Sequence, residues 1–409
     1  MKLRPFGTRA TIQIRFAAMK QRDSLFTPIV PRDFQHHLFR AITSYRGNLP
    51  SREGLQATYE LLPSPDSNFI KDFQSTGFDA RIWELYLCAL FHSLGISLSQ
   101  PNDRPDFCLT GGDEIVWVEA TMANPTQGGV QSQPEGHWEE IDRVAAKVGS
   151  ALFSKLNKRY WELPHVSGKP LVLAIADFHD PDPLRQNVGP ISRYLYGKHS
   201  KLTSATGEPV QSELLEVKSL GPKKVPAGFF YLPDAQYISA VLFSNAGTTG
   251  KFSRMAFDTA RHPFVRMLRH GFSYNRESTA VAPEPFAYIV GSAPETWGQE
   301  AIVMHNPNAL YPVSQTFFEP LCQQWFIQDD FRYKLPSFLP ILSRTIIVSG
   351  NPTKMQAVES HLLDMGRKWV LGTWGKMPEL ENDIIKSHQE WQSQNKPIHF
   401  GICTPNLTV

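Results

Sequence analysis

The strongest hydrophobic pattern of the chain lies between residues 79 and 176. A run that is apolar on almost every side opens it, and such a run is typical of a buried helix. Two shorter apolar runs around a Gly-Gly-Asp turn follow and predict a β-hairpin. In order, the pattern predicts a helix, a strand, a hairpin, a helix and a strand: Asp79–Leu94, Ile96–Leu98, Asp106–Thr110 with Glu114–Thr121, His137–Leu163 and Leu171–Ala176. This alternation predicts an α/β fold with helices on both faces of a sheet.

The pattern outside this region is weaker and suggests three segments. Residues 1–75 are expected to form a basic N-terminal segment with one or two short helices, one of them Arg32–Tyr45. The core would extend over 76–320, with a loop-rich insertion at about 179–235, and 321–409 would form a C-terminal subdomain. Further elements are predicted as follows: a strand at Tyr237–Ser244, an outer hairpin of Phe286–Val290 with Ala301–His305, a strand at Arg344–Val348 and a helix at Thr353–Arg367.

Composition narrows the class of protein. Hydrophobic residues make up 41% and charged residues 20% of the 409 residues, which suits a folded domain with a real core. No apolar run approaches the roughly 18–20 residues of a membrane span, and the first residues lack the apolar centre of a secretory signal. The four cysteines lie far apart without a CxxC pair, so we expect reduced thiols and a cytoplasmic location.

Positive charge is concentrated at the start of the chain. Residues 1–50 contain nine lysines and arginines but only two acidic residues, an excess of seven positive charges, whereas the whole chain has a net charge of +2. A local excess of this size suits contacts with phosphate groups. A solvated basic surface without a ligand explains it equally well.

Three carboxylates stand where an apolar core would not place them. Glu84 lies within the apolar helix, Asp106 begins the first hairpin strand, and Glu119 ends the apolar run of the second. Hairpin pairing would bring Asp106 near Glu119, and a buried charge needs a partner or a metal. Oxygen-rich sites of this kind bind Mg²⁺ or Mn²⁺. The alternative is a set of strand-end acids with a buried salt bridge from Glu84 to Arg81 or Arg143.

This spacing resembles the PD-(D/E)XK nuclease superfamily, which has the restriction-endonuclease-like fold. The resemblance rests on Glu84, on Pro105-Asp106, and on Glu119-Ala120-Thr121 thirteen residues later, and it covers residues 79–176. It implies a restriction-endonuclease-like core sheet with a large C-terminal elaboration. It further implies that Asp106 and Glu119, with the Ala120 carbonyl, bind a catalytic Mg²⁺ or Mn²⁺, and that Glu84 is a further ligand or holds a second metal.

The sequence departs from the family pattern at Thr121, where the motif has a lysine. A lysine there orients the attacking water and stabilises charge on the phosphate, which threonine cannot do. The helix predicted at 137–163 offers replacements. Lys155 falls on its apolar stripe and is our choice for the catalytic lysine, while Lys147 is an alternative. Lys155 would otherwise extend its stem along the core and place its charge in water.

Arginines and phenylalanines alternate over residues 252–272. Interleaved arginine and aromatic side chains can grip nucleic acid, but an amphipathic core helix would give the same pattern.

These observations lead to one main functional hypothesis and two alternatives. The resemblance implies a metal-dependent endonuclease that hydrolyses DNA, with a role in restriction or antiviral defence. A catalytically degenerate nucleic-acid-binding module is the first alternative, and Thr121 is its best support. A regulatory subunit of a larger complex is the second. Many such nucleases are dimers, because two strands need two sites, so the resemblance also implies a homodimer or a partner protein.

Overall fold

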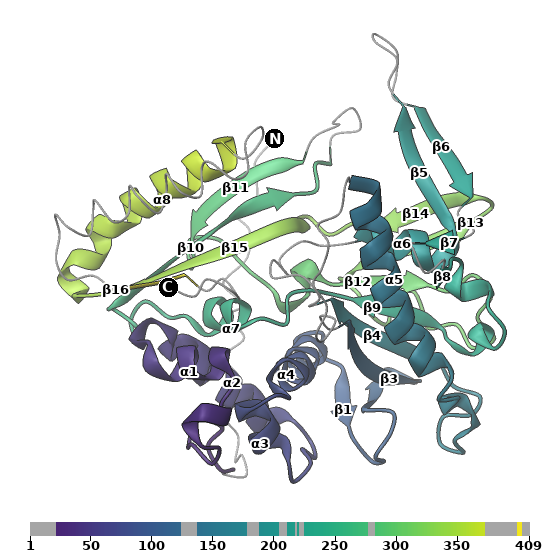
Figure 1. Cartoon of the computed structure of the whole chain (residues 1–409), viewed down its shortest axis with the longest axis horizontal. Helices are drawn as coiled ribbons and strands as arrows, with labels where there is room; N and C mark the ends of the chain where they lie inside the picture. The colour runs from purple at the N-terminus through teal and green to yellow at the C-terminus, as the bar shows by residue number, and fades with distance from the viewer. Residues whose placement is uncertain are drawn as a thin grey trace, which may run out of the picture.

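Two β-sheets with helices packed against them make up the molecule (Figure 1). The computed structural model describes residues 22–123, 137–177, 188–203, 211–216, 219–220, 225–276, 283–372 and 399–402. The α/β class expected from the sequence is confirmed as a large mixed sheet flanked by helices. Among the described residues, no helix combines the length and the apolar character needed to cross a membrane.

The larger sheet has eight strands in the order β1-β2-β3-β4-β9-β12-β13-β14. The strands β1 to β3 are antiparallel to one another, whereas β3, β4 and β9 are parallel, so the carboxyl ends of these three lie at one edge. Their bounds are β1 Ser97–Ser99, β2 Phe107–Gly111, β3 Glu114–Ala123, β4 Leu171–Asp177, β9 Ala240–Phe243, β12 Ile302–His305, β13 Cys322–Ile327 and β14 Asp330–Lys334.

Helices cover both faces of this sheet. Successive side chains of each strand point to opposite faces and pack against the helices there. In β3, Val116 and Val118 belong to the core that α4 completes, whereas Trp117 belongs to the core beneath α5. Helices α2 and α3 pack against α4, and α1 packs against α2. Figure 1 shows α5 lying over the opposite face with α6. The bounds are α1 His37–Ser44, α2 Leu49–Leu61, α3 Phe69–Gln74, α4 Phe78–Ser93, α5 His137–Leu156 and α6 Val188–Tyr196.

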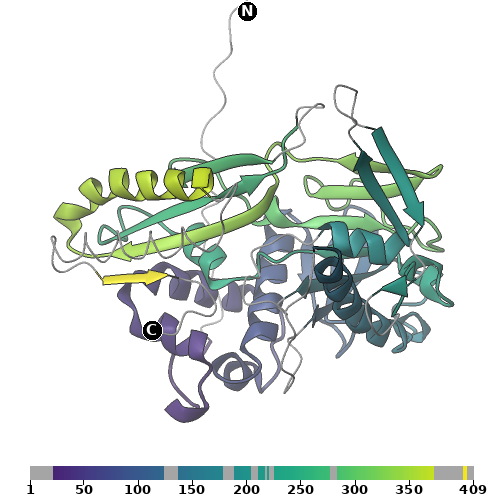
Figure 2. The ribbon, with the colours of Figure 1, turned by 45° about the horizontal axis from the view of Figure 1, so that its top comes forward.

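The smaller sheet has four antiparallel strands in the order β11-β10-β15-β16. Helix α8 covers one face, as the turned view shows (Figure 2), and the other face packs near Tyr45, Leu49 and Phe257. The bounds are β10 Val265–Ser273, β11 Glu284–Ile289, β15 Pro340–Ser349, β16 His399–Ile402, α7 Thr249–Ala256 and α8 Met355–Gly372.

Short hairpins and single turns of 3-10 helix complete the described elements. The hairpins pair β5 Lys198–Thr203 with β6 Gln211–Glu216, and β7 Ser219–Leu220 with β8 Val225–Pro226. The 3-10 turns are η1 Arg32–Phe34, η2 Arg46–Asn48, η3 Tyr160–Glu162, η4 Phe229–Tyr231, η5 Ala235–Tyr237, η6 Trp297–Glu300 and η7 Pro352–Lys354.

The order of elements predicted between residues 79 and 176 is confirmed, but the end of the long helix and the outer hairpin are wrong, and the helix considered as an alternative for residues 252–272 is present only up to Ala256. The long helix ends at Leu156 instead of Leu163, because Arg159 adopts a left-handed conformation and η3 follows. The outer hairpin of 286–290 with 301–305 does not form, since β11 pairs with β10 while β12 lies between β9 and β13. Residues 265–273 form strand β10 and not part of an amphipathic helix.

The two sheets also divide the chain differently from the three segments expected from the sequence. After residue 320, β13 and β14 extend the larger sheet, whereas β15 and β16 join the smaller one. The smaller sheet takes its other two strands from before that point, β10 and β11.

Candidate active site

The β2–β3 hairpin brings Asp106 and Glu119 together, as the hairpin pairing predicted. Phe107 pairs with Val118 in the antiparallel register, so Asp106 and Glu119 stand opposite one another at the next position. The Ala120 amide donates a hydrogen bond to Oδ2 of Asp106 at 2.7 Å. Glu119 alternates with Val118 and therefore faces the α5 side of the sheet, where it is only 4% exposed.

Lys155 reaches Glu119 from helix α5. Its Nζ lies 2.5 Å from Oε1 of Glu119. The periodicity that placed Lys155 on the core-facing stripe of the helix is confirmed, because Val144 and Val148 on the same stripe are buried and the lysine side chain is only 25% exposed. Of the two lysines considered from the sequence, Lys155 is the one that pairs with Glu119.

Tyr160 completes the surroundings of Glu119 and was missed by the sequence reasoning. Its hydroxyl donates to Oε1 of Glu119 at 2.7 Å, and the side chain is buried. The predicted helix extended through residue 163, which gave Tyr160 no distinct position. The left-handed Arg159 ends the helix early, and no periodicity in the sequence signals that turn.

Glu84 lies nearby but is engaged with an arginine. Both its carboxylate oxygens accept from Nη1 of Arg81, at 3.1 and 3.2 Å. Arg81 also pairs with Asp66 and Asp72, each at 2.7 Å. The salt bridge to Arg81 that was the alternative explanation for Glu84 is therefore present. Glu84 is still close enough to Asp106 for its charge to act on that residue.

The neighbouring carboxylates and burial change the pKa of Asp106. Burial, the neighbouring charge of Glu119 and the more distant charge of Glu84 raise the pKa of Asp106 to about 7, against the opposing effect of the Ala120 amide and Lys155. Burial also raises the pKa of Glu84, although Arg81 opposes the shift. Burial and the bond to Glu119 raise the pKa of Tyr160, which keeps its hydroxyl protonated as a donor. At neutral pH Asp106 is thus about half protonated, beside a Glu119 that Lys155 already contacts.

The donor set fits a divalent cation in one respect. Oε2 of Glu119 is buried and has no hydrogen-bond partner among the described residues, although its other oxygen has two. A buried carboxylate oxygen without a donor is costly, and a cation would satisfy it. Within the described ranges, no group of three or more His, Cys, Asp or Glu side chains is arranged to ligate a single ion.

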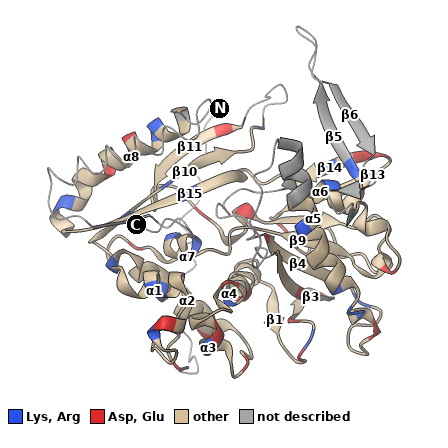
Figure 3. Ribbon diagram, viewed as in Figure 1, with Lys and Arg blue, Asp and Glu red and all other residues tan. Residues whose placement is uncertain are grey.

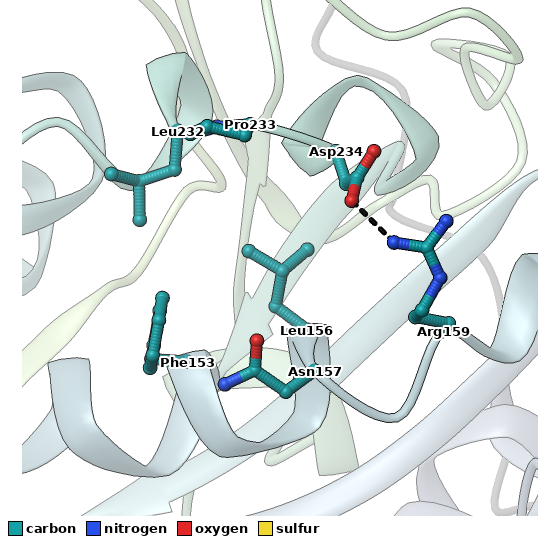
Figure 4. Close-up of a pocket in the computed structure, with 7 residues that line it drawn as sticks. All are labelled: Phe153, Leu156, Asn157, Arg159, Leu232, Pro233 and Asp234. Atoms are coloured by element: carbon teal, nitrogen blue, oxygen red, sulfur yellow. Dashed lines mark hydrogen bonds and ion pairs between the residues drawn. The ribbon is translucent and has the colours of Figure 1, made fainter.

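The surface pocket next to α5 is a different feature. It is lined by Phe153, Leu232 and Asp234 among others, with the Arg159–Asp234 ion pair at its rim (Figure 4). Phe153 and Lys155 are two residues apart on α5 and so project about 160° from one another. The pocket therefore lies on the side of the helix away from the carboxylates.

Two of the four arginines of residues 252–272 lie inside the protein. Arg254 and Arg269 are buried and form ion pairs with Glu295 and Glu300. These two arginines are therefore not available at the surface for nucleic acid. In the described part of the N-terminal segment, α1 carries Arg40, α2 carries Arg52 with Glu53 and Glu60, and α3 carries Lys71 with Asp72, so both signs of charge occur there (Figure 3). Five of the nine basic residues of the first fifty fall outside the described residues: Lys2, Arg4, Arg9, Arg15 and Lys20.

Comparison of the chain with protein-family models, curated proteins and solved structures found no match.

Proposed function

We propose that this protein is a metal-dependent nuclease that hydrolyses phosphodiester bonds of DNA. One observation carries the proposal: Asp106, Glu119 and Lys155, from three separate segments, meet at a site where two carboxylates face one another and a lysine contacts one of them. Paired carboxylates hold a divalent metal, and an adjacent ammonium stabilises charge on a phosphate.

The residues that would hold the metal follow from the local geometry. Oε2 of Glu119, Asp106 and the Ala120 carbonyl would be the ligands, with Glu84 as a further one. When bound, Mg²⁺ or Mn²⁺ would lower the pKa of water and neutralise charge on the phosphate. Because an ionised Asp106 is needed, the cation would also lower the pKa that crowding has raised.

The lysine supplies the remaining electrostatic part. In hydrolysis, a water oxygen bonds to phosphorus, one P–O bond breaks, and the departing oxygen takes up a proton. Negative charge grows on the non-bridging oxygens as this happens. The Lys155 ammonium, once it turns from Glu119 toward the substrate, would donate to one of those oxygens. It would thereby take the role that Thr121 cannot fill.

We also propose that residues 79–176 form a restriction-endonuclease-like core. The support is the order α4, β1, β2, β3, α5, β4, with the four strands adjacent in the sheet, Asp106 immediately before β2 and Glu119 on β3. A role in restriction or antiviral defence in the cytoplasm belongs to the same proposal, as does assembly into a homodimer or with a partner protein. The unpaired cysteines of the described residues are consistent with a reducing compartment.

The decisive experiment measures cleavage of plasmid and linear DNA with Mg²⁺ or Mn²⁺. Wild type should cut in a metal-dependent manner, and Asp106→Ala and Glu119→Ala should each lose activity by about 10²-fold or more. Asp113→Ala is the matched control, because Asp113 is an exposed acid on the turn of the same hairpin. DNA binding without cutting under either metal would support the degenerate module instead.

A further inference from the structure

The two donors to Glu119 share a single oxygen. Lys155 Nζ and the Tyr160 hydroxyl both contact Oε1, at 2.5 and 2.7 Å, while Oε2 has no partner among the described residues. The carboxylate is therefore held through Oε1, while the buried Oε2 is left for another ligand. Such an arrangement orients an oxygen toward a ligand without competing for it.

The turn after α5 places Tyr160 at this point. The amides of Lys158 and Arg159 bond to the carbonyls of Lys155 and Leu156, and Arg159 then turns left-handed at a φ of 49°. Its guanidinium is held by Glu162 and Asp234, at 2.7 and 2.6 Å. The chain returns immediately into η3, so Tyr160 points back to the same carboxylate as Lys155.

We propose that Tyr160 is a positioning residue that holds Oε1 of Glu119 so that Lys155 can leave the carboxylate and act on the substrate phosphate. This inference rests on the proposed nuclease function and deepens it. It assigns different tasks to two donors that contact the same atom.

The chemistry of the two donors separates those tasks. An ammonium on a carboxylate neutralises its charge, whereas a neutral hydroxyl fixes the oxygen and leaves the negative charge in place. A carboxylate held by Tyr160 alone therefore keeps its full attraction for a divalent cation. Without Tyr160, departure of Lys155 would leave a buried carboxylate with no donor at all, so the lysine would stay where it is.

The test compares Tyr160→Phe with Tyr194→Phe. Tyr194 is a matched control: it is equally buried, packs in the same core against α5, and donates to the backbone carbonyl of Gly149 at 3.1 Å. For each protein we would measure Mn²⁺ affinity by calorimetry, kcat and KM for DNA cleavage, and the melting temperature without metal.

We expect Tyr160→Phe to weaken Mn²⁺ binding and lower kcat, each by about 10- to 100-fold, with KM for DNA unchanged. Tyr194→Phe should match wild type in both metal affinity and kcat, and the two variants should melt at similar temperatures. If Tyr160→Phe behaves like Tyr194→Phe in metal affinity and kcat, the inference is wrong while the nuclease proposal stands. If wild type binds Mn²⁺ but cuts no DNA, the nuclease proposal fails, and the Mn²⁺ affinities of the variants alone decide the role of Tyr160.

Discussion

Lys155 contacts Glu119 from helix α5, whereas the family motif that the sequence resembles has its lysine on the strand. The motif lysine would stand at position 121, two residues after Glu119 on the same face of β3, yet that position holds threonine. Helix α5 lies over this face, so a lysine on its inner stripe reaches the same carboxylate from above.

Replacing Lys155 with methionine should therefore abolish cleavage. We expect kcat to fall by about 10²- to 10³-fold, because the developing phosphate charge loses its donor, while the apolar stem is retained. Lys158→Met is the control, since Lys158 is exposed just beyond the same helix. Cleavage rates of both variants and wild type under saturating Mg²⁺ would test this prediction. Equal activity of the two variants would show that another group fills the lysine's place.

The raised pKa of Asp106 predicts how activity depends on pH. Burial and the charge of Glu119 hold this pKa at about 7, well above the ordinary value of 3.8. The metal needs the ionised carboxylate, so at subsaturating Mg²⁺ the cleavage rate should fall about tenfold per pH unit below 7 and level off above it. A rate that stays constant from pH 5 to 8 would contradict this assignment.

The same shift predicts a pH-dependent cost to folding in the absence of metal. Because the folded pKa lies above the unfolded one, the cost is absent below about pH 3.8, grows between pH 3.8 and 7, and is complete above 7. Asp106→Asn removes the charge and keeps an acceptor for the Ala120 amide. Relative to wild type, this variant should gain roughly 2–4 kcal/mol of stability between pH 4 and pH 8. Urea unfolding at both pH values would measure it, and a pH-independent difference would contradict it.

The sequence was informative about residues whose partners are near in the chain or on a regular element. Asp106 and Glu119 follow from the pairing of one hairpin, and Lys155 follows from helical periodicity. Tyr160 does not follow, because a single left-handed residue redirects the chain before it. The sequence offered two possible partners for Glu84, Arg81 and Arg143, and gave no reason to prefer one of them. In the structure, Glu84 pairs with Arg81.

At the scale of elements, a buried network of charges joins helix α7 to the smaller sheet. Lys251 and Arg254 on α7 and Arg269 on β10 are almost fully buried, and all three pair with Glu295 and Glu300. Arg254 also donates to the Thr345 hydroxyl on β15. Two carboxylates from the segment that leads into β12 thus pair with three cations on α7 and β10. Removing one carboxylate would leave cations buried without sufficient countercharge.

Glu300→Gln should therefore destabilise the fold by roughly 3–5 kcal/mol at neutral pH, as judged by urea unfolding. Asp330→Asn, which breaks the exposed pair with Arg332, is the control and should cost at most about 1 kcal/mol. Burial opposes ionisation of Glu300, but Arg269 and the other cations outweigh it and hold the pKa below its ordinary value. The stability that ionised Glu300 contributes is thus present at pH values above its ordinary pKa and is lost as the pH falls through its lowered pKa. A deficit of Glu300→Gln that persists undiminished in acid would contradict this account.

The elements themselves were easier to predict than their partners. The apolar runs of β11 and β12 are both strands at the expected places, yet they belong to different sheets. The hydrophobic pattern of a strand indicates which of its faces is buried, but it does not indicate which strand will pair with it. Local turns fix the partner of β2, which is β3, whereas β10 finds β15 some seventy residues later. Long-range pairing of that kind depends on packing between whole layers.

For the whole molecule, the distribution of charge raises the question of how DNA approaches. The chain has a net charge of +2, while its first fifty residues carry +7, so the remainder is net negative by five. The candidate site itself gathers carboxylates. A polyanion would be repelled by such a surface unless a basic segment offset it. The N-terminal segment is the part of the sequence suited to that task.

Deletion of residues 1–21 tests this role, since these residues include five lysines and arginines and no acid. In an Asp106→Ala background that cannot cut, we expect weaker DNA binding at low salt. The slope of log K against log salt should become shallower by about 2–4, because each lost phosphate contact removes about 0.9 from it. A full-length variant with those five residues changed to glutamine separates charge from chain length and should lose as much. If both proteins keep the original slope, the basic segment is only a solvated surface, and the DNA-contacting charges lie elsewhere in the chain.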